Sequence, residues 1–254
     1  MTFTTEEITL TNNREENIAA VLHVPPQQRD EGHCVVLCHG MLSNKDGTKQ
    51  IALCRALHAR GIASLRFDFR GRGRSDGAFE DTTISRRLED LEAVLAHVDA
   101  RGYSSISLVG SSLGAPVAII EAAKGPAPAV ASLVTYAAVS RAEQLLDFFP
   151  PQHVAEWKKA GMLDFVGNRI KWDFIDDALT HDVLAAAGSL RCPTLLIHGS
   201  ADALVPVESS RIIWEAIKAE KDFVLIEGAD HTFIDDRHRE QAIELTLQWI
   251  EKHH

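Results

Sequence analysis

The sequence predicts an α/β fold, built as a mostly parallel twisted sheet with helices on both faces. Short, almost wholly apolar runs rich in Val, Ile and Leu recur along the chain, as is typical of strands buried on both faces. Segments with helical periodicity separate these runs, and this alternation indicates β–α–β crossovers. The chain has 254 residues, 45% hydrophobic and 24% charged, which is long enough to bury a sizeable core without disulfide bonds.

Each element of this fold has its own pattern in the sequence. Residues 8–10 and 18–24 alternate apolar and polar side chains, which predicts an antiparallel pair at a sheet edge. Buried strands are predicted over residues 34–38, 63–67, 106–109, 130–136, 194–197 and 223–226. Helices are predicted over residues 48–60, 84–101, 113–124, 207–219 and 236–252.

Residues 141–190 interrupt the alternation of strands and helices. The stretch is too long for a connecting loop and, with residues such as Trp157, Phe165 and Phe174, too aromatic for a disordered linker. We predict a small, mostly helical cap insertion here, over a core formed by residues 1–140 and 191–254. One or two of its aromatic side chains are expected to line a substrate pocket.

Composition narrows the classes of function. The net charge of −10, from 36 acidic and 26 basic residues, argues against nucleic acid or an anionic membrane as the main partner. No apolar run reaches transmembrane length, and the first residues lack a signal-peptide pattern, so a cytoplasmic location is expected. The composition leaves open whether the protein forms a homodimer. Four cysteines fit neither a zinc nor a redox spacing and are expected to be buried apolar residues: Cys34, Cys38, Cys54 and Cys192.

The segment Gly110-Ser111-Ser112-Leu113-Gly114 has the form G-x-S-x-G and lies between a predicted strand and a predicted helix. In such a turn the central serine is held in a strained backbone conformation with its hydroxyl exposed, and side chains at the glycines would clash. Ser112 is therefore the predicted nucleophile. Ser111 is the alternative, but it lacks the flanking glycines and is expected to pack behind the turn, where it contributes with Gly40 to substrate binding.

A serine nucleophile needs a base, and the base needs an orienting acid. Asp202 and His231 each follow a predicted strand, and the order Ser, Asp, His is the one expected for a G-x-S-x-G turn of this kind. A helix cap for the serine and a turn role for Asp202 are the structural alternatives. Asp147 is the alternative acid, and two other histidines at strand ends are alternative bases: His39 and His198.

The same strand edge predicts an oxyanion hole. His39-Gly40-Met41 follows the strand at 34–38, and Gly40 lets the chain turn so that the Met41 N–H points inward. The Leu113 N–H is the second expected donor. Each such donor contributes roughly 3 kcal/mol in a transition state.

With these pieces the chain resembles a compact α/β-hydrolase of the serine-hydrolase and esterase kind, over residues 35–231. The resemblance is carried by His39-Gly40, the run Phe67-Asp68-Phe69-Arg70-Gly71-Arg72-Gly73-Arg74-Ser75-Asp76-Gly77, the serine turn, Asp202 and His231. Residues 40–49 and 108–114 are similar to the acyl-protein thioesterase branch, while the Ser75-Asp76-Gly77 loop and the insertion are similar to cinnamoyl-type esterases. The resemblance implies hydrolysis of small or medium acyl esters or thioesters by Ser112, Asp202 and His231, without a metal or cofactor.

Two other functions, and a second role for a group of arginines, stay open at this point. A peptidase of the prolyl-aminopeptidase kind would need an anchor for a free amino terminus, and the sequence shows no obvious one. A non-catalytic binding protein on the same fold would be expected to lack part of the triad. The arginines at 66, 70, 72 and 74 are predicted to form salt bridges around their loop, with attraction of an anionic substrate as the alternative.

Overall fold

A computed structural model describes residues 5–254, apart from the side chains of Ala142, Leu145 and Phe148, so residues 1–4, on which the signal-peptide expectation partly rests, lie outside the description. Its centre is an eight-stranded sheet with the strand order β1-β2-β4-β3-β5-β6-β9-β10. The strands at one edge are antiparallel to their neighbours, and all the others run parallel. Their bounds are β1 Thr5–Thr11, β2 Asn17–His23, β3 His33–Cys38, β4 Ala63–Phe67, β5 Ser105–Ser111, β6 Ala129–Tyr136, β9 Thr194–Gly199 and β10 Lys221–Ile226. The predicted parallel sheet with an antiparallel edge pair is confirmed.

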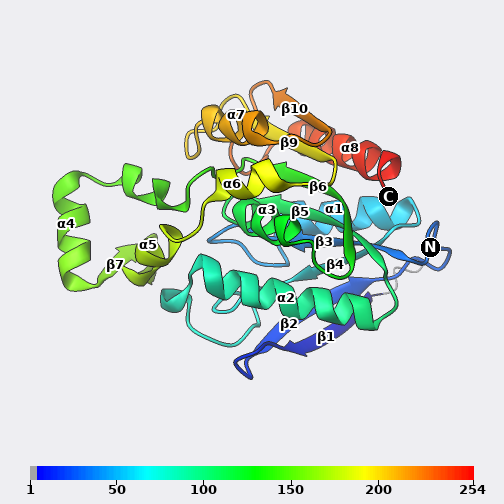
Figure 1. Cartoon of the computed structure of the whole chain (residues 1–254), viewed down its shortest axis with the longest axis horizontal. Coiled ribbons are helices and arrows are strands. Elements are labelled where there is room, and N and C mark those ends of the chain that lie inside the picture. Colours follow the sequence, from blue (N-terminus) through cyan, green and yellow to red (C-terminus); the bar gives the residue numbers. More distant parts are fainter. Residues whose placement is uncertain (1–4) are drawn as a thin grey trace.

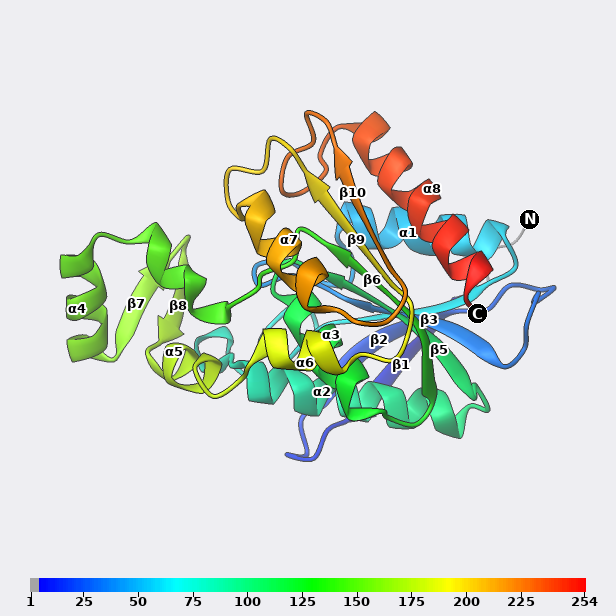
Figure 2. The same cartoon turned by 45° about the horizontal axis from the view of Figure 1, so that its top comes forward.

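Helices cover both faces of this sheet (Figures 1 and 2). One face carries α1 (Thr48–Ala59) and α8 (Asp236–Lys252), and the other carries α2 (Ile84–Ala100), α3 (Gly114–Lys124), α6 (Val183–Ser189) and α7 (Val207–Ala216). Side chains of β3 alternate between the two layers, with Val35 and Leu37 packed towards α1 and α8, and Cys34 and Val36 towards α2 and α3. This two-sided burial explains why the central strands read as continuous apolar runs.

The segment between β6 and β9 forms the cap, which projects from one end of the core (Figure 1). It contains η2 (Ala142–Phe148), α4 (Pro151–Ala160), β7 (Met162–Phe165), β8 (Asn168–Lys171) and α5 (Asp173–Ala178), followed by α6, which packs on α3 and α7. Trp157 is buried in the cap, with its ring against Phe149 and Trp172. The cap thus has a small aromatic core of its own.

The antiparallel hairpin formed by β7 and β8 is a feature that the sequence analysis did not predict. Each strand has only four residues, and β8 reads Asn-Arg-Ile-Lys, so neither forms an apolar run.

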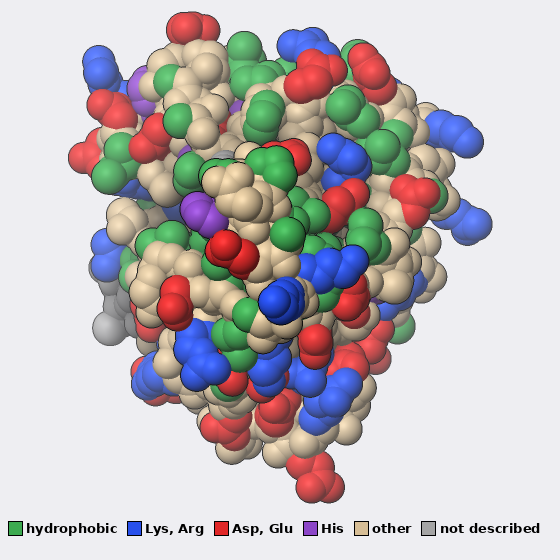
Figure 3. All heavy atoms as spheres, turned by 90° about the vertical axis from the view of Figure 1, so that its left-hand side faces the viewer, with side chains coloured by type: hydrophobic (Ala, Val, Ile, Leu, Met, Phe, Trp, Pro, Cys, Tyr) green, Lys and Arg blue, Asp and Glu red, His purple; other side chains and the backbone are tan. Residues whose placement is uncertain are grey.

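On the face of the molecule that carries the cap, acidic and basic side chains are intermixed (Figure 3). Within residues 5–254, no helix is both long and apolar enough to span a membrane. The remaining element, η1, covers Phe79–Asp81, and all four cysteines are buried and free.

Candidate active site

Ser112 lies in a tight turn between the end of β5 and the start of α3. Its φ of 53° falls in the left-handed region, which is strained for a residue with a side chain. A Cβ at Gly110 would lie 2.6 Å from Ala115 Cα, and one at Gly114 would lie 2.3 Å from Cys38 O. Backbone lies on both sides of the turn, so glycine is required at both positions, as the sequence pattern predicted.

The turn brings the Ser112 hydroxyl to a histidine and an aspartate from two other strand ends. Ser112 Oγ lies 3.0 Å from His231 Nε2, and His231 Nδ1 lies 2.7 Å from Asp202 Oδ2. Asp202 follows β9 and His231 follows β10, and these strands run parallel to each other, so both side chains reach the same sheet edge as Ser112. The structure therefore places the three predicted residues in one hydrogen-bonded chain.

Asp202 is held as a carboxylate by four donors. Oδ1 accepts from the N–H groups of Leu204 and Val205, both at 2.8 Å, while Oδ2 also lies 3.2 Å from His198 Nε2. Burial raises the pKa of Asp202, but the hydrogen bonds from His198, His231 and the Val205 N–H outweigh burial and hold its pKa well below the usual range. An ionised Asp202 keeps the Nδ1–H tautomer of His231, which leaves Nε2 free to accept the serine proton.

The alternative residues of the sequence analysis lie elsewhere. His198 is buried behind Asp202, with Nδ1 2.7 Å from Ser210 Oγ, so it supports the acid and does not reach the serine. Asp147 lines the cavity above the site, while Nδ1 of His231 is bound to Asp202 instead. Asp230, beside His231, accepts hydrogen bonds from its own turn, including the Ile234 N–H at 3.0 Å.

His39 is fully buried beneath the predicted oxyanion loop. Its Nε2 accepts from the Phe69 N–H at 3.0 Å, and its Nδ1 donates to Gly40 O at 2.7 Å. Burial lowers the pKa of His39 to about 3, with a further contribution from Arg87, so the ring is neutral and these partners fix its tautomer.

This bond from His39 fixes the direction of the Met41 N–H. The carbonyl of Gly40 and the N–H of Met41 belong to one planar trans peptide, so holding the carbonyl also holds the N–H on the opposite side. Among residues 5–254, neither the Met41 N–H nor the Leu113 N–H has a hydrogen-bond partner. A Cβ at Gly40 would lie 3.2 Å from Ser112 Cβ, so glycine allows the loop to approach the nucleophile closely.

The hydroxyl of Ser111 has a different hydrogen-bond partner from that of Ser112. It accepts a hydrogen bond from Lys49 Nζ at 2.8 Å, beneath the turn. Lys49 is a site residue that the sequence analysis did not single out, because its position on a predicted helix gives no sign of a contact across 62 residues of sequence. Both residues also border the cavity described next.

A cavity of ≈ 1410 Å³ opens above Ser112, between the core and the cap. The cap contributes Phe149, Phe165 and Phe174 to its wall. Three exposed apolar side chains also border the cavity: Val166, Leu204 and Ile234, which are 73%, 52% and 75% exposed. The volume exceeds the roughly 300–1,000 Å³ of ordinary ligand pockets, and the wall is predominantly apolar. The cavity can therefore hold a large apolar group next to the serine.

The arginines of the 66–74 loop have structural partners. Ion pairs join Arg66 to Asp46, Arg70 to Asp90 and Arg74 to Glu7. Arg72 forms no such pair with any residue that the structure describes. It instead donates to the carbonyls of Leu42 and Ser43 and to Asn168 of β8, which corrects the expectation of a salt bridge at this position. The guanidinium of Arg72 thus connects the oxyanion loop to the cap hairpin, because both segments offer it oxygen acceptors.

Comparison with known proteins gives a consistent result. The Alpha/beta hydrolase family matches residues 35–245. The chain is 28% identical over 205 residues to the mitochondrial palmitoyl-protein thioesterase ABHD10 of Bos taurus, a match that covers 78% of this chain and 66% of that protein, just under two thirds of its length. The solved structure of alpha/beta hydrolase domain-containing protein 10 from mouse is 25% identical with a TM-score of 0.82, covering 97% of this chain and 99% of that one. Est1E from Butyrivibrio proteoclasticus, solved with ferulic acid bound, shares the fold with a TM-score of 0.84 at 23% identity, covering 96% and 99% of the two chains.

Proposed function

Because the chain belongs to the α/β-hydrolase family, we propose that it is a serine hydrolase that cleaves carboxylic esters or thioesters through an acyl-enzyme on Ser112. The observation that carries this proposal is the hydrogen-bonded chain from Ser112 Oγ through His231 to Asp202. A serine hydroxyl is a weak nucleophile on its own, and a neutral imidazole oriented by a carboxylate is the arrangement that activates it.

The geometry supports a two-step reaction. In the first step His231 Nε2 takes the Ser112 proton while Oγ attacks the substrate carbonyl, and the tetrahedral oxyanion is bound by the N–H groups of Met41 and Leu113. His231 then protonates the departing alcohol or thiol, which leaves the acyl group on Ser112. In the second step His231 activates a water molecule, which releases the acid and restores the serine. Asp202 stabilises the imidazolium formed in both steps.

The cavity supports a substrate with an apolar acyl chain. Its predominantly apolar wall and its exposed apolar rim offer a large area for hydrocarbon, which gains about 0.8 kcal/mol per buried CH₂. The name of the bovine relative, a palmitoyl-protein thioesterase, points in the same direction. We therefore propose acyl chains longer than acetyl as the preferred substrates.

The test is a hydrolysis screen with p-nitrophenyl esters from acetate to palmitate, the matching acyl thioesters, and aminoacyl anilides. The wild-type protein is expected to hydrolyse esters and thioesters but not anilides. Ser112→Ala is expected to lose nearly all turnover while keeping its melting temperature. Ser189→Ala on α6, an exposed serine whose hydroxyl donates to Ala185 O, is the matched control and should keep full activity. A Ser112→Ala protein with wild-type rates would overturn the proposal, and preferential cleavage of anilides would favour a peptidase.

A further inference from the structure

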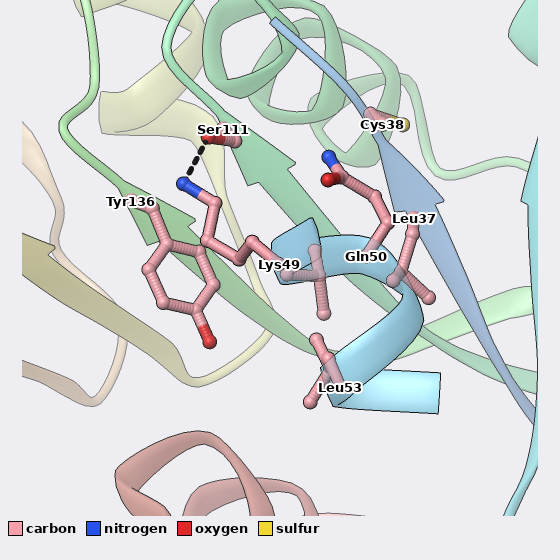
Figure 4. Close-up of a pocket in the computed structure, with 8 residues that line it drawn as sticks. Leu37, Cys38, Lys49, Gln50, Leu53, Ser111 and Tyr136 are labelled. Atoms are coloured by element: carbon pink, nitrogen blue, oxygen red, sulfur yellow. Dashed lines mark hydrogen bonds between the residues drawn. The ribbon is translucent and has the colours of Figure 1, made fainter. Parts of the chain in front are cut away.

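Lys49 is a half-buried cation directly beneath the nucleophile turn. Its Nζ donates to Ser111 Oγ at 2.8 Å, and Figure 4 shows the side chain running from α1 up to this hydroxyl. The ammonium also lies 4.9 Å from the ring centre of Tyr136 and 5.1 Å from that of Phe233. Among residues 5–254, no carboxylate lies within 4.0 Å of Lys49 Nζ, so it is not part of an ion pair. Its partners are thus one hydroxyl and two aromatic faces.

Two of these three contacts belong to the chain segments that carry the nucleophile and the base, and the third, Tyr136, ends β6. Ser111 directly precedes Ser112, and Phe233 follows His231 by two residues. Phe233 is fully buried, has a φ of 55°, and packs edge-to-face on Tyr136 at 5.7 Å. One ammonium therefore contacts both the serine turn and the histidine loop, whose relative position sets the distance between Ser112 Oγ and His231 Nε2.

Placing an ammonium here is costly, because burial disfavours the charged form of lysine. Burial lowers the pKa of Lys49 to about 8, and the negative charges of Asp230 and Asp202 offset part of this effect. Lys49 also borders a small, mostly apolar cavity, whose wall includes Leu37, Leu53 and Val109. A methionine would fill this space without the cost, so packing alone does not account for a lysine.

We propose that Lys49 is a positioning residue for the hydrolysis at Ser112, and that its ammonium fixes the serine turn against the His231 loop. The inference rests on the proposed function and adds a residue to it. The charge also adds positive potential below the site where a substrate oxyanion would form, in surroundings where charges are poorly screened. Lys49 itself forms and breaks no covalent bond in the reaction.

The proposal predicts a pH dependence with a known sign. The titratable groups around Lys49 are Cys38 of β3, Tyr136 of β6, Asp202 after β9, and Asp230 and His231 after β10. Burial raises the pKa of the Cys38 thiol and of the Tyr136 hydroxyl well above their usual values, so neither loses its proton near pH 8. Loss of the Lys49 proton is therefore expected to lower kcat as the pH rises through about 8.

The test compares Lys49→Met, Lys49→Arg and Ser111→Ala, with the exposed Lys218→Met as control. Lys49→Met is expected to lower kcat roughly tenfold to a hundredfold with little change in KM, and to remove the decline above pH 8. Lys49→Arg, which keeps the charge, should recover part of kcat and move the decline to higher pH. Ser111→Ala removes only the acceptor and should lower kcat in the same direction, and it serves if Lys49→Met does not fold.

The outcomes separate this inference from the proposed function. If Ser112→Ala is inactive but Lys49→Met and Ser111→Ala both retain wild-type kcat, the role of Lys49 is refuted and the serine mechanism stands. The same conclusion follows if Lys49→Met keeps the wild-type decline above pH 8. If the wild-type protein hydrolyses no ester or thioester, both proposals fail together.

Discussion

Replacing Asp202 with asparagine probes the hydrogen-bonded chain at its most buried point. The Asp202 side chain has no exposed surface, and its Oδ2 accepts from both His231 and His198, at 2.7 and 3.2 Å. In Asp202→Asn one oxygen becomes an NH₂ group. Oδ1 is already fixed by the N–H groups of Leu204 and Val205, so the amide nitrogen must face the two histidines.

The consequence for His231 follows from donor and acceptor counting. An amide N–H facing Nδ1 forces the proton onto Nε2, and a protonated Nε2 cannot accept the proton of Ser112. In the serine-protease triad the corresponding change lowers kcat about 10⁴-fold, which equals about 5.4 kcal/mol of lost transition-state stabilisation. We expect a loss of this order in kcat for Asp202→Asn, with KM nearly unchanged.

Stability gives a second measurement of the same substitution. Because the folded protein depresses the pKa of Asp202, the ionised carboxylate stabilises the fold above its ordinary pKa of about 4 and loses this contribution as the pH falls towards the folded value. The difference in melting temperature between the wild type and Asp202→Asn should therefore be largest near neutral pH and shrink below pH 4. Steady-state kinetics and thermal melts at pH 3 to 8 measure both effects. An asparagine variant within tenfold of the wild-type kcat would refute the reasoning.

Three further substitutions test other parts of the site. Gly114→Ala places a Cβ 2.3 Å from Cys38 O, so we expect at least a hundredfold loss of activity and a lower melting temperature; an active, stable variant would contradict the account of the turn. His39→Leu removes the donor to Gly40 O and should lower kcat roughly a hundredfold with little effect on KM. A rise in KM of the same size with kcat unchanged would argue against a role for His39 in orienting the oxyanion loop. Phe165→Trp enlarges a side chain of the cavity wall and should lower kcat/KM for palmitoyl esters more than for acetyl esters, whereas equal losses would place the acyl chain elsewhere.

Those parts of the structure that local sequence pattern decides could be predicted from the sequence. Buried parallel strands are apolar on both faces, so their ends could be located, and with them the positions of Ser112, Asp202 and His231 at one sheet edge. The two glycines around Ser112 predicted a close approach of backbone, and the structure shows what a Cβ at each position would meet.

Features that depend on contacts across the chain were not predictable in this way. The β7–β8 hairpin consists of short, partly exposed strands, and their pairing is set by the cap. Lys49 lies on an ordinary helix in the sequence, and only the packing of α1 under β5 brings its ammonium to Ser111. Arg72 was expected to pair with an acid, but the nearest acceptors in the fold are carbonyl oxygens.

The central claim is that the Ser112 oxygen becomes covalently acylated during turnover. The most direct measurement is to mix the protein with a p-nitrophenyl acyl ester, stop the reaction with acid within the first turnover, and locate the acyl group by peptide mass spectrometry. The account predicts one acyl group, on the peptide that contains Ser112, and none in Ser112→Ala. Continued hydrolysis with the acyl group on another residue, or with Ser112 never acylated under these conditions, would contradict it.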